Sequence, residues 1–189
     1  MNVKDMLRQA SDAAKQLITL SDQTIIGILK ETAQVLRTHT EEVLAANRQD
    51  LERMDPANPK YDRLKLTEER LQGIAADMEN VSTLPSPLNK VLSETIRPNG
   101  MVIRKVTVPF GVIGVIYEAR PNVTFDVFSL CFRSGNVCVL KGGSDADFSN
   151  RALVRIIHSV LERQGINPAV CTLLPPDREA TAELLGAVG

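Results

Sequence analysis

Cysteine and histidine are scarce in this sequence, which has three cysteines (Cys131, Cys138 and Cys171) and two histidines in 189 residues. The cysteines form no closely spaced pair and have no histidine neighbour, which argues against a disulfide-stapled fold and against a zinc site. Free cysteines of this kind suit a reducing compartment. We therefore expect no metal centre and a cytoplasmic protein.

The sequence also lacks an excess of either charge and any long apolar run. It has 22 basic and 23 acidic residues, and no basic cluster with interleaved aromatic residues, so nucleic acid is not an expected partner. No apolar run approaches the roughly 18 residues of a membrane-spanning helix. The N-terminus has no secretory hydrophobic region. We expect a soluble protein that does not associate with a membrane.

What is present is enough apolar residue content for a substantial core, since 43% of the 189 residues are hydrophobic. This length suits one domain with an appendage. The pattern divides the chain into a helical part over residues 1–90, a β-hairpin over residues 91–108 and an α/β part over residues 109–189. The predicted class is α/β.

The first part reads as a series of helices followed by a proline-containing linker. One helix is predicted over residues 3–20, where small and apolar residues recur at helical spacing. A second begins after Ser21, and Thr40 and Thr67 are expected to cap a third and a fourth. We interpret the helix after Thr67 as scaffold. Residues 81–90 form the linker.

Two strand candidates, residues 91–97 and 101–108, are joined by Pro98-Asn99-Gly100. Asn-Gly between strands is a strong hairpin signal, because both residues tolerate a positive φ. A two-stranded hairpin is marginal alone and needs a surface to lie against. That surface is either another subunit or the hairpin's own domain.

Residues 108–144 organise the rest of the chain and read VPFGVIGVIYEARPNVTFDVFSLCFRSGNVCVLKGGS. The apolar run of residues 112–117 is typical of a strand covered on both faces, so we expect it to be a central parallel strand. A helix over residues 123–133 follows, with Asn122 as its expected cap. Gly135 ends that helix, and residues 137–140 form the next strand.

The remaining residues continue the same alternation. Ser144 or Asp145 is expected to cap a helix that reaches Gln164. A third strand is predicted over residues 170–174, and a further helix opens at Asp177. Three strands with their helices make half of a doubly wound, Rossmann-like parallel sheet.

Polar and charged residues follow both of the first two parallel strands. Ligands of doubly wound sheets bind outside the carboxyl ends of the strands, so the loops of residues 117–122 and 141–144 should face one crevice. A lysine, two glycines and a serine at a helix start suit a phosphate or ribose, although an ordinary glycine turn with a solvated lysine explains them too. The sequence has no G-x-G-x-x-G motif.

The segments VPFGVIGVIYEARPNVT and SGNVCVLKGGSDA resemble the gamma-glutamyl phosphate reductase family of the aldehyde dehydrogenase superfamily. The string YEARPN, residues 117–122, is the most specific part. The wider superfamily shares Pro109, Gly111 and Val112, the Ser134-Gly135-Asn136 step, and Lys141. The resemblance extends over the whole chain, which looks like the N-terminal portion of such a protein.

The resemblance implies NADPH-dependent reduction of gamma-glutamyl phosphate to glutamate 5-semialdehyde and phosphate, in proline biosynthesis. It implies an aldehyde-dehydrogenase-like fold in which residues 91–108 act as an oligomerisation arm, giving a homo-oligomer. The implied cofactor-binding residues are Tyr117, Lys141, Gly142, Gly143 and Ser144. We expect NADP(H) rather than NAD(H), because Ser144 stands where a carboxylate would repel a 2′-phosphate.

The loop after the first parallel strand is the expected substrate region. Arg120 can hold an acidic substrate bidentately, and gamma-glutamyl phosphate carries both a carboxylate and a phosphate. Glu118 is the second expected substrate residue. Asn122 lies close to the asparagine whose amide stabilises an oxyanion in the superfamily, so it is either an oxyanion donor or the helix cap named above.

The family's route to the aldehyde uses a cysteine thiolate that displaces phosphate to form a thioester. That cysteine lies in a later domain, which we expect to be absent here. The three cysteines of this chain fall inside predicted helices and strands, where cysteine usually acts as a small hydrophobic residue. The chain alone is therefore expected to be inactive. It is a portion of a reductase, a non-catalytic nucleotide-binding or assembly module, or a fragment completed by a separate subunit.

Overall fold

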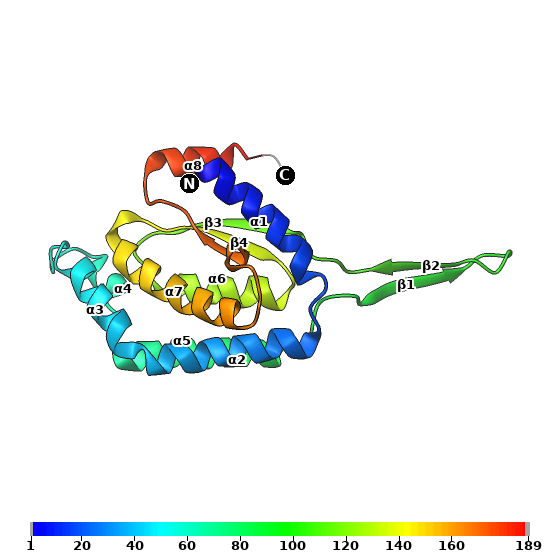
Figure 1. Cartoon of the computed structure of the whole chain (residues 1–189), viewed down its shortest axis with the longest axis horizontal. Coiled ribbons are helices and arrows are strands. Elements are labelled where there is room, and N and C mark those ends of the chain that lie inside the picture. The colour runs from blue at the N-terminus through cyan, green and yellow to red at the C-terminus, as the bar shows by residue number, and fades with distance from the viewer. Residues whose placement is uncertain (1, 188–189) are drawn as a thin grey trace.

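A computed structural model describes residues 2–187 of the chain and shows a parallel sheet between layers of helices, with a long hairpin projecting from one end (Figure 1). The elements, in chain order, are α1 (Val3–Leu17), α2 (Asp22–Thr38), α3 (Thr40–Leu51), α4 (Tyr61–Leu64), α5 (Glu68–Thr83), β1 (Val91–Ile96), β2 (Val102–Val106), β3 (Val112–Ile116), α6 (Asn122–Arg133), β4 (Val137–Lys141), α7 (Asp147–Arg163), β5 (Cys171–Leu173) and α8 (Arg178–Leu185). None of the described helices is long and apolar enough to cross a membrane.

The sheet has the strand order β3-β4-β5, and both pairs of neighbours are parallel. β4 is buried along its whole length, as the apolar run of residues 137–140 predicts. Helices α6 and α7 pack against one face of the sheet, and α1 packs against the other face beside α8. This is the order of the first three strands of a doubly wound sheet, so the predicted half-sheet is confirmed.

The prediction that β3 is a central strand covered on both faces is wrong for this chain. β3 is an edge strand, and Val112 and Ile116 keep 39% and 45% of their surface exposed. Their side of the strand lines a groove of about 750 Å³ with α1 and α8. β3 therefore carries more apolar side-chain surface than its edge position in this sheet buries. A doubly wound sheet adds its fourth strand beside its first, which is this open edge.

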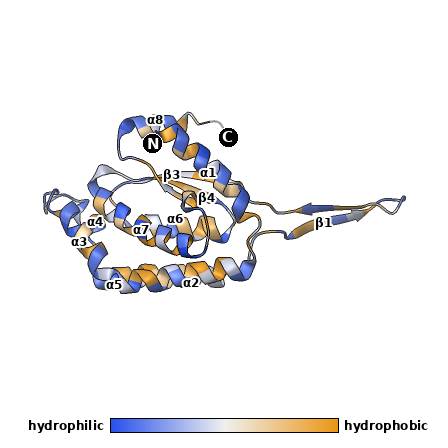
Figure 2. Ribbon diagram, in the orientation of Figure 1, coloured by the Kyte–Doolittle hydropathy of each residue, from blue (hydrophilic) through white to orange (hydrophobic). Residues whose placement is uncertain are grey.

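An outer layer of helices lies over α6 and α7. Helix α2 packs against α5 and α7, and α3 packs against α7. Figure 2 shows hydrophobic and hydrophilic residues alternating along α2 and α5, as expected of helices with one buried face. The cap predicted at Thr67 is confirmed, because its hydroxyl accepts the N–H group of Arg70 at 3.1 Å. Ser21, after which the second helix was expected to begin, caps α2 in the same way by accepting the N–H group of Thr24 at 3.1 Å.

The predicted cap at Thr40 is wrong. His39 alone separates α2 from α3, and the Thr40 hydroxyl turns back to donate to the Arg37 carbonyl at 3.0 Å. The carbonyls at the end of α2 lack helical partners and compete for this hydroxyl. Thr40 thus serves the end of one helix and not the start of the next.

Arg133 at the end of α6 holds the layers together. Its side chain is 5% exposed, and its Nε donates to the Leu84 carbonyl at 3.1 Å. It also forms an ion pair with Asp22 in the first turn of α2. One guanidinium therefore joins the C-terminus of α5, the N-terminus of α2 and the end of α6.

The predicted hairpin is confirmed. Strands β1 and β2 are antiparallel, with Ile96 opposite Val102, and Gly100 in the turn has a φ of +82°. Every residue of both strands is exposed. The hairpin extends away from the body of the molecule (Figure 1), so it does not fold back onto its own domain.

Two glycines with the same left-handed backbone allow the packing at the end of α6 to be tested. Gly135 has a φ of +71° and an added Cβ would lie 2.9 Å from Leu88 Cδ1, whereas Gly165 has a φ of +68° and open space around it. We expect Gly165→Ala to lower the free energy of unfolding by about 1 kcal/mol through backbone strain alone. Gly135→Ala should lower it by about 2 kcal/mol, because strain and crowding combine. Urea denaturation measures both, and equal losses would contradict the packing described here.

Candidate functional site

The two polar loops expected to share a crevice are adjacent in the structure. The Tyr117 N–H donates to the Lys141 carbonyl at 3.1 Å, extending the pairing of β3 with β4 to the ends of both strands. A Cβ added to Gly143 would lie 3.6 Å from the Cα of Glu118. The carboxyl ends of the two strands thus bring residues 117–122 beside residues 141–144.

Lys141 is buried, with 8% of its surface exposed. Its Nζ donates to the Pro176 carbonyl at 3.1 Å, in the loop after β5. An ammonium has three N–H donors, so this bond leaves donors available. The lysine therefore connects the second and third strands at their carboxyl ends and keeps hydrogen-bonding capacity there.

Gly142, within the loop of residues 141–144, is closely packed against Asn150 and Tyr117. A Cβ at Gly142 would lie 2.3 Å from Asn150 Nδ2 and 3.6 Å from Tyr117 Cζ. The Tyr117 hydroxyl donates to Thr124 at 2.7 Å, and Thr124 donates to Asn150 at 3.1 Å. Burial raises the pKa of Tyr117 well above its ordinary value, so the phenol stays neutral. Its hydroxyl faces the interior and not the crevice.

The cap predicted for the next helix at Ser144 or Asp145 is wrong. Residues 144–146 form a 3₁₀ turn, and neither side chain caps α7. The cap comes from Asp50 on α3, whose carboxylate accepts the N–H groups of Phe148 at 3.2 Å and Ser149 at 2.8 Å. Ser144 is left exposed at the mouth of the loop.

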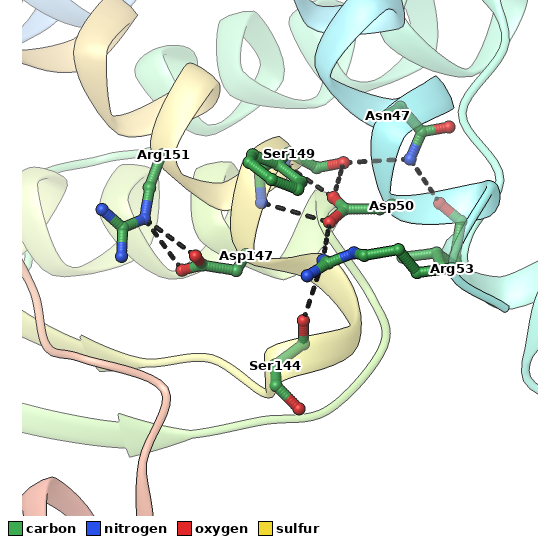
Figure 3. A network of polar contacts seen from close by, with 9 residues as sticks. Asn47, Asp50, Arg53, Ser144, Asp147, Ser149 and Arg151 are labelled. Carbon is green, nitrogen blue, oxygen red and sulfur yellow. Dashed lines mark hydrogen bonds and ion pairs between the residues drawn. The ribbon is translucent and has the colours of Figure 1, made fainter.

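Asp50 is the centre of the polar network in Figure 3. Arg53 donates to Asp50 at 2.6 Å and to the Ser144 carbonyl at 3.2 Å. The Ser149 hydroxyl donates to Asp50 at 2.6 Å and accepts from Asn47 at 3.0 Å. Arg53 also lies over the Phe148 ring, 4.6 Å from its centroid. The network therefore fixes the start of α7 and the end of the Lys141–Ser144 loop from a helix about ninety residues earlier.

Sequence reasoning missed these residues, although a signal was present. Asn47 and Asp50 are three residues apart, so they share one face of α3. That face also carries the buried residues Val43 and Ala46. Polar side chains on the buried face of an amphipathic helix need partners, which is a reason to look for a network there.

Glu118 and Arg120 were both expected to contact substrate, but they belong to different surroundings. The Glu118 carboxylate pairs with Lys60 Nζ at 3.2 Å, and Lys60 lies 3.9 Å from the carboxylate of Asp145. Between the two expected residues, Ala119 has a φ of +40°, an uncommon conformation for a residue with a Cβ. This turn separates Glu118, beside the Ser144 loop, from Arg120.

Arg120 and Asn122 line a cleft of about 360 Å³ between α4, α5 and the start of α6. The other lining residues are Asp62, Arg63, Lys65, Leu66, Arg70, Gly73, Ile74 and Asp77. Helix α5, which we interpreted as scaffold, thus contributes charged side chains to a surface shared with the predicted loop.

Asn122 does not cap α6. Pro121, with a φ of −58°, occupies the N-cap position, and Asn122 is the first helical residue. Its Nδ2 donates to Asp126 Oδ2 at 3.0 Å, one turn further on. Burial raises the pKa of Asp126, the bond from Asn122 opposes this, and the negative charge of Asp77 adds to it.

The three cysteines are all buried. Burial raises the pKa of Cys131 to about 12, and contact with Cys171 together with burial raises the pKa of Cys138. The thiols of Cys131 and Cys138 are therefore protonated at neutral pH. Within residues 2–187, no three His, Cys, Asp or Glu side chains gather where a metal ion could bind.

No protein-family profile matches the chain. The chain is 64% identical over 187 residues to a gamma-glutamyl phosphate reductase of Azobacteroides pseudotrichonymphae, which covers 99% of this chain and 45% of that protein. It therefore spans less than half the length of this curated relative.

Two solved structures have the same arrangement of elements. The gamma-glutamyl phosphate reductase of Thermotoga maritima superposes with a TM-score of 0.93 at 31% identity, over 98% of this chain and 46% of that one. A probable aldehyde dehydrogenase of Listeria monocytogenes has a TM-score of 0.74 at 17% identity, over 98% of this chain and 39% of that one. The predicted aldehyde-dehydrogenase-like α/β fold is therefore confirmed.

Replacing Asp50 tests the cap on α7. Asp50→Asn keeps the shape of the side chain and removes the charge that accepts two N–H groups, a hydroxyl and a guanidinium. We expect a loss of about 1–3 kcal/mol in the free energy of unfolding, and faster hydrogen exchange at the amides of Phe148 and Ser149. Asp147→Asn is the matched control, because Asp147 lies in the same helical turn and, within residues 2–187, its carboxylate pairs with Arg151 alone. Similar exchange rates in both variants would show that Asp50 does not hold α7.

Proposed function

We propose that this chain, which resembles gamma-glutamyl phosphate reductases along its whole length, is the cofactor-binding portion of such an enzyme. The reaction is the NADPH-dependent reduction of gamma-glutamyl phosphate to glutamate 5-semialdehyde and phosphate, in proline biosynthesis in the cytoplasm. The single observation that carries this proposal is the match at 64% identity over 99% of the chain. The geometry of the two loops agrees with it.

The proposed cofactor site is the loop of residues 141–144 with Tyr117 beneath it. Gly142 is tightly enclosed, since a Cβ there would lie 2.3 Å from Asn150 Nδ2, and Gly143 lies beside Glu118. Lys141 keeps unused N–H donors for ribose hydroxyls. NADPH supplies the hydride when it is bound. The residues of this chain hold its adenosine end, and the fit is to the ribose more than to the pyrophosphate, because Asp50 already occupies the N-terminus of α7.

A 2′-phosphate distinguishes NADPH from NADH, and we propose that Ser144 binds this phosphate. The exposed hydroxyl can donate to a phosphate oxygen, whereas a carboxylate at this position would repel it. Arg53 donates to the Ser144 carbonyl at 3.2 Å and is about half exposed. Its guanidinium is paired with the Asp50 carboxylate at 2.6 Å, so it fixes the Ser144 backbone and adds little net charge there.

For the substrate, we propose that Arg120 binds an acidic group and that Asn122 donates to the developing oxyanion. An amide nitrogen carries two N–H donors. The bond to Asp126 takes one, which orients the side chain and leaves the second for a substrate oxygen. The pairing of Glu118 with Lys60 makes Glu118 the least favoured of the expected substrate residues.

The covalent step needs a thiolate, and the three cysteines here are poor candidates. All three are buried, and the pKa values of Cys131 and Cys138 are raised by their surroundings. We propose that the nucleophile lies outside this chain and that the chain alone does not turn over. The alternative is a non-catalytic nucleotide-binding or assembly module, which would bind nucleotide without a substrate preference in the Arg120 cleft.

The hairpin is the proposed oligomerisation arm. Its apolar side chains are exposed, including Ile96 at 67% and Val102 at 48%, and exposed strand edges readily pair with another chain. We expect the chain to form a homo-oligomer in solution and Ile96→Asp to dissociate it. Ser93→Asp is the control, since Ser93 points to the other face of the same strand. Light scattering after gel filtration gives the molar mass of both variants and of the wild type. A monomeric wild type would contradict the proposal that the hairpin is an oligomerisation arm.

The cofactor proposal is tested by titrating NADPH and NADH against the purified chain, followed by nucleotide fluorescence. We expect NADPH to bind more tightly, and Ser144→Glu to weaken NADPH by about tenfold or more while NADH changes little. Ser93→Glu on the hairpin is the matched control and should leave both affinities unchanged. Equal affinities for the two nucleotides, or a Ser144→Glu variant with wild-type NADPH affinity, would overturn the assignment of Ser144.

A further inference from the structure

The charges lining the Arg120 cleft fall into a paired set and a set without partners. Arg70 is fully engaged: its Nη2 donates to both Asp62 oxygens, at 3.0 and 3.2 Å, and its Nη1 donates to the Lys65 carbonyl at 2.6 Å. Arg70 and Asp62 neutralise each other and form a fixed wall. They do not provide charge for a ligand.

The charges that remain are of both signs. Among the described residues, the side chains of Arg63, Lys65, Arg120 and Asp77 form no ion pair within 4.0 Å. All four line the same cleft. Three cations and one carboxylate are therefore available to a ligand in one concave surface.

The carboxylate of Asp126 adds negative charge near the Asp77 side of the cleft. Asp77 acts electrostatically on Asp126, which is partly buried and hydrogen-bonded to Asn122 at the cleft wall. The negative charges of Asp77 and Asp126 together favour a cation on this side of the cleft. Gly73 precedes Asp77 by one helical turn and also lines the cleft, so no side chain from that position covers the surface beside Asp77.

We infer that this cleft binds the α-amino-acid head of a glutamyl substrate, with its ammonium group at Asp77 and its carboxylate at Arg120 and Arg63. The inference rests on the proposed function and deepens it, because it names residues that would select the substrate. A zwitterion carries both charges on one carbon atom, which matches a cleft with free charges of both signs. Asn122 on the same wall would then face the acyl end of the ligand.

A simple anion fits the cleft less well than a zwitterion does. Inorganic phosphate or a dicarboxylate would meet Arg120 and Arg63 but would be repelled by Asp77 and Asp126. The lining also contains no aromatic residue on which a base could stack. Asp77 therefore makes the cleft bind an amino acid more tightly than the corresponding acid that lacks the amino group.

The test is a titration of the isotopically labelled chain, followed by backbone amide shifts in NMR spectra. The probes are L-glutamate and glutarate, which differs from it by lacking the α-ammonium group. We expect L-glutamate to shift the amides of Gly73, Asp77 and Asn122 with a dissociation constant on the order of 10 mM, and glutarate to bind several times more weakly.

Two variants and one control assign the charges. Asp77→Asn should weaken L-glutamate about fivefold and leave glutarate unchanged or slightly tighter, whereas Arg120→Gln should weaken both probes. Glu69→Gln is the matched control, because it removes a negative charge from α5 outside the cleft and should change neither affinity.

The outcomes separate this inference from the cofactor proposal. Absence of cleft shifts up to about 100 mM L-glutamate, equal binding of glutarate, an unaffected Asp77→Asn variant, or stronger binding of inorganic phosphate would each overturn the amino-acid subsite. NADPH binding measured on the same sample is independent of these results. A chain that binds NADPH without cleft shifts refutes the inference alone, and cleft shifts without NADPH binding refute the cofactor assignment alone.

Discussion

The buried carboxylate of Asp50 is the interaction on which the arrangement of the site depends. Only 1% of Asp50 is exposed, and an isolated charge at such a position would be very unfavourable. Two backbone N–H groups of α7, a hydroxyl and the Arg53 guanidinium satisfy it. Because the Lys141–Ser144 loop runs directly into α7, the carboxylate that fixes the start of this helix also fixes the loop. The outer helical layer therefore positions a site to which it contributes little direct contact.

A second constraint divides the surface at the carboxyl ends of β3 and β4. The turn at Ala119 directs Glu118 toward Lys60 and the Ser144 loop, and places Arg120 in the cleft beside α5. A dinucleotide on one side and an acidic substrate on the other would then approach each other across one short loop. The strained conformation of Ala119 is consistent with a turn that is held by its surroundings for this purpose.

Local features of the fold could be predicted from the sequence, whereas long-range ones could not. The start of α2 after Ser21, the cap at Thr67, the Asn-Gly hairpin and the buried strand β4 depend on residues close in sequence. The cap on α7 was mispredicted because its carboxylate comes from another helix. β3 was mispredicted as central because an apolar run reports how much a strand can bury, and not which neighbours this chain provides. The cleft lined by Arg120 and α5 needs the packing of three separate elements, so no local pattern reveals it.

We propose that this chain carries a cofactor site and a substrate cleft and does not supply the catalytic thiolate. The most direct test is phosphate-dependent oxidation of glutamate 5-semialdehyde by the purified chain with NADP+, followed as NADPH formation, with a full-length gamma-glutamyl phosphate reductase as the positive control. The account predicts no NADPH formation by the chain under conditions in which the control is active. Turnover that disappears when Cys131, Cys138 or Cys171 is replaced by serine would contradict it, because one of these buried thiols would then be the nucleophile.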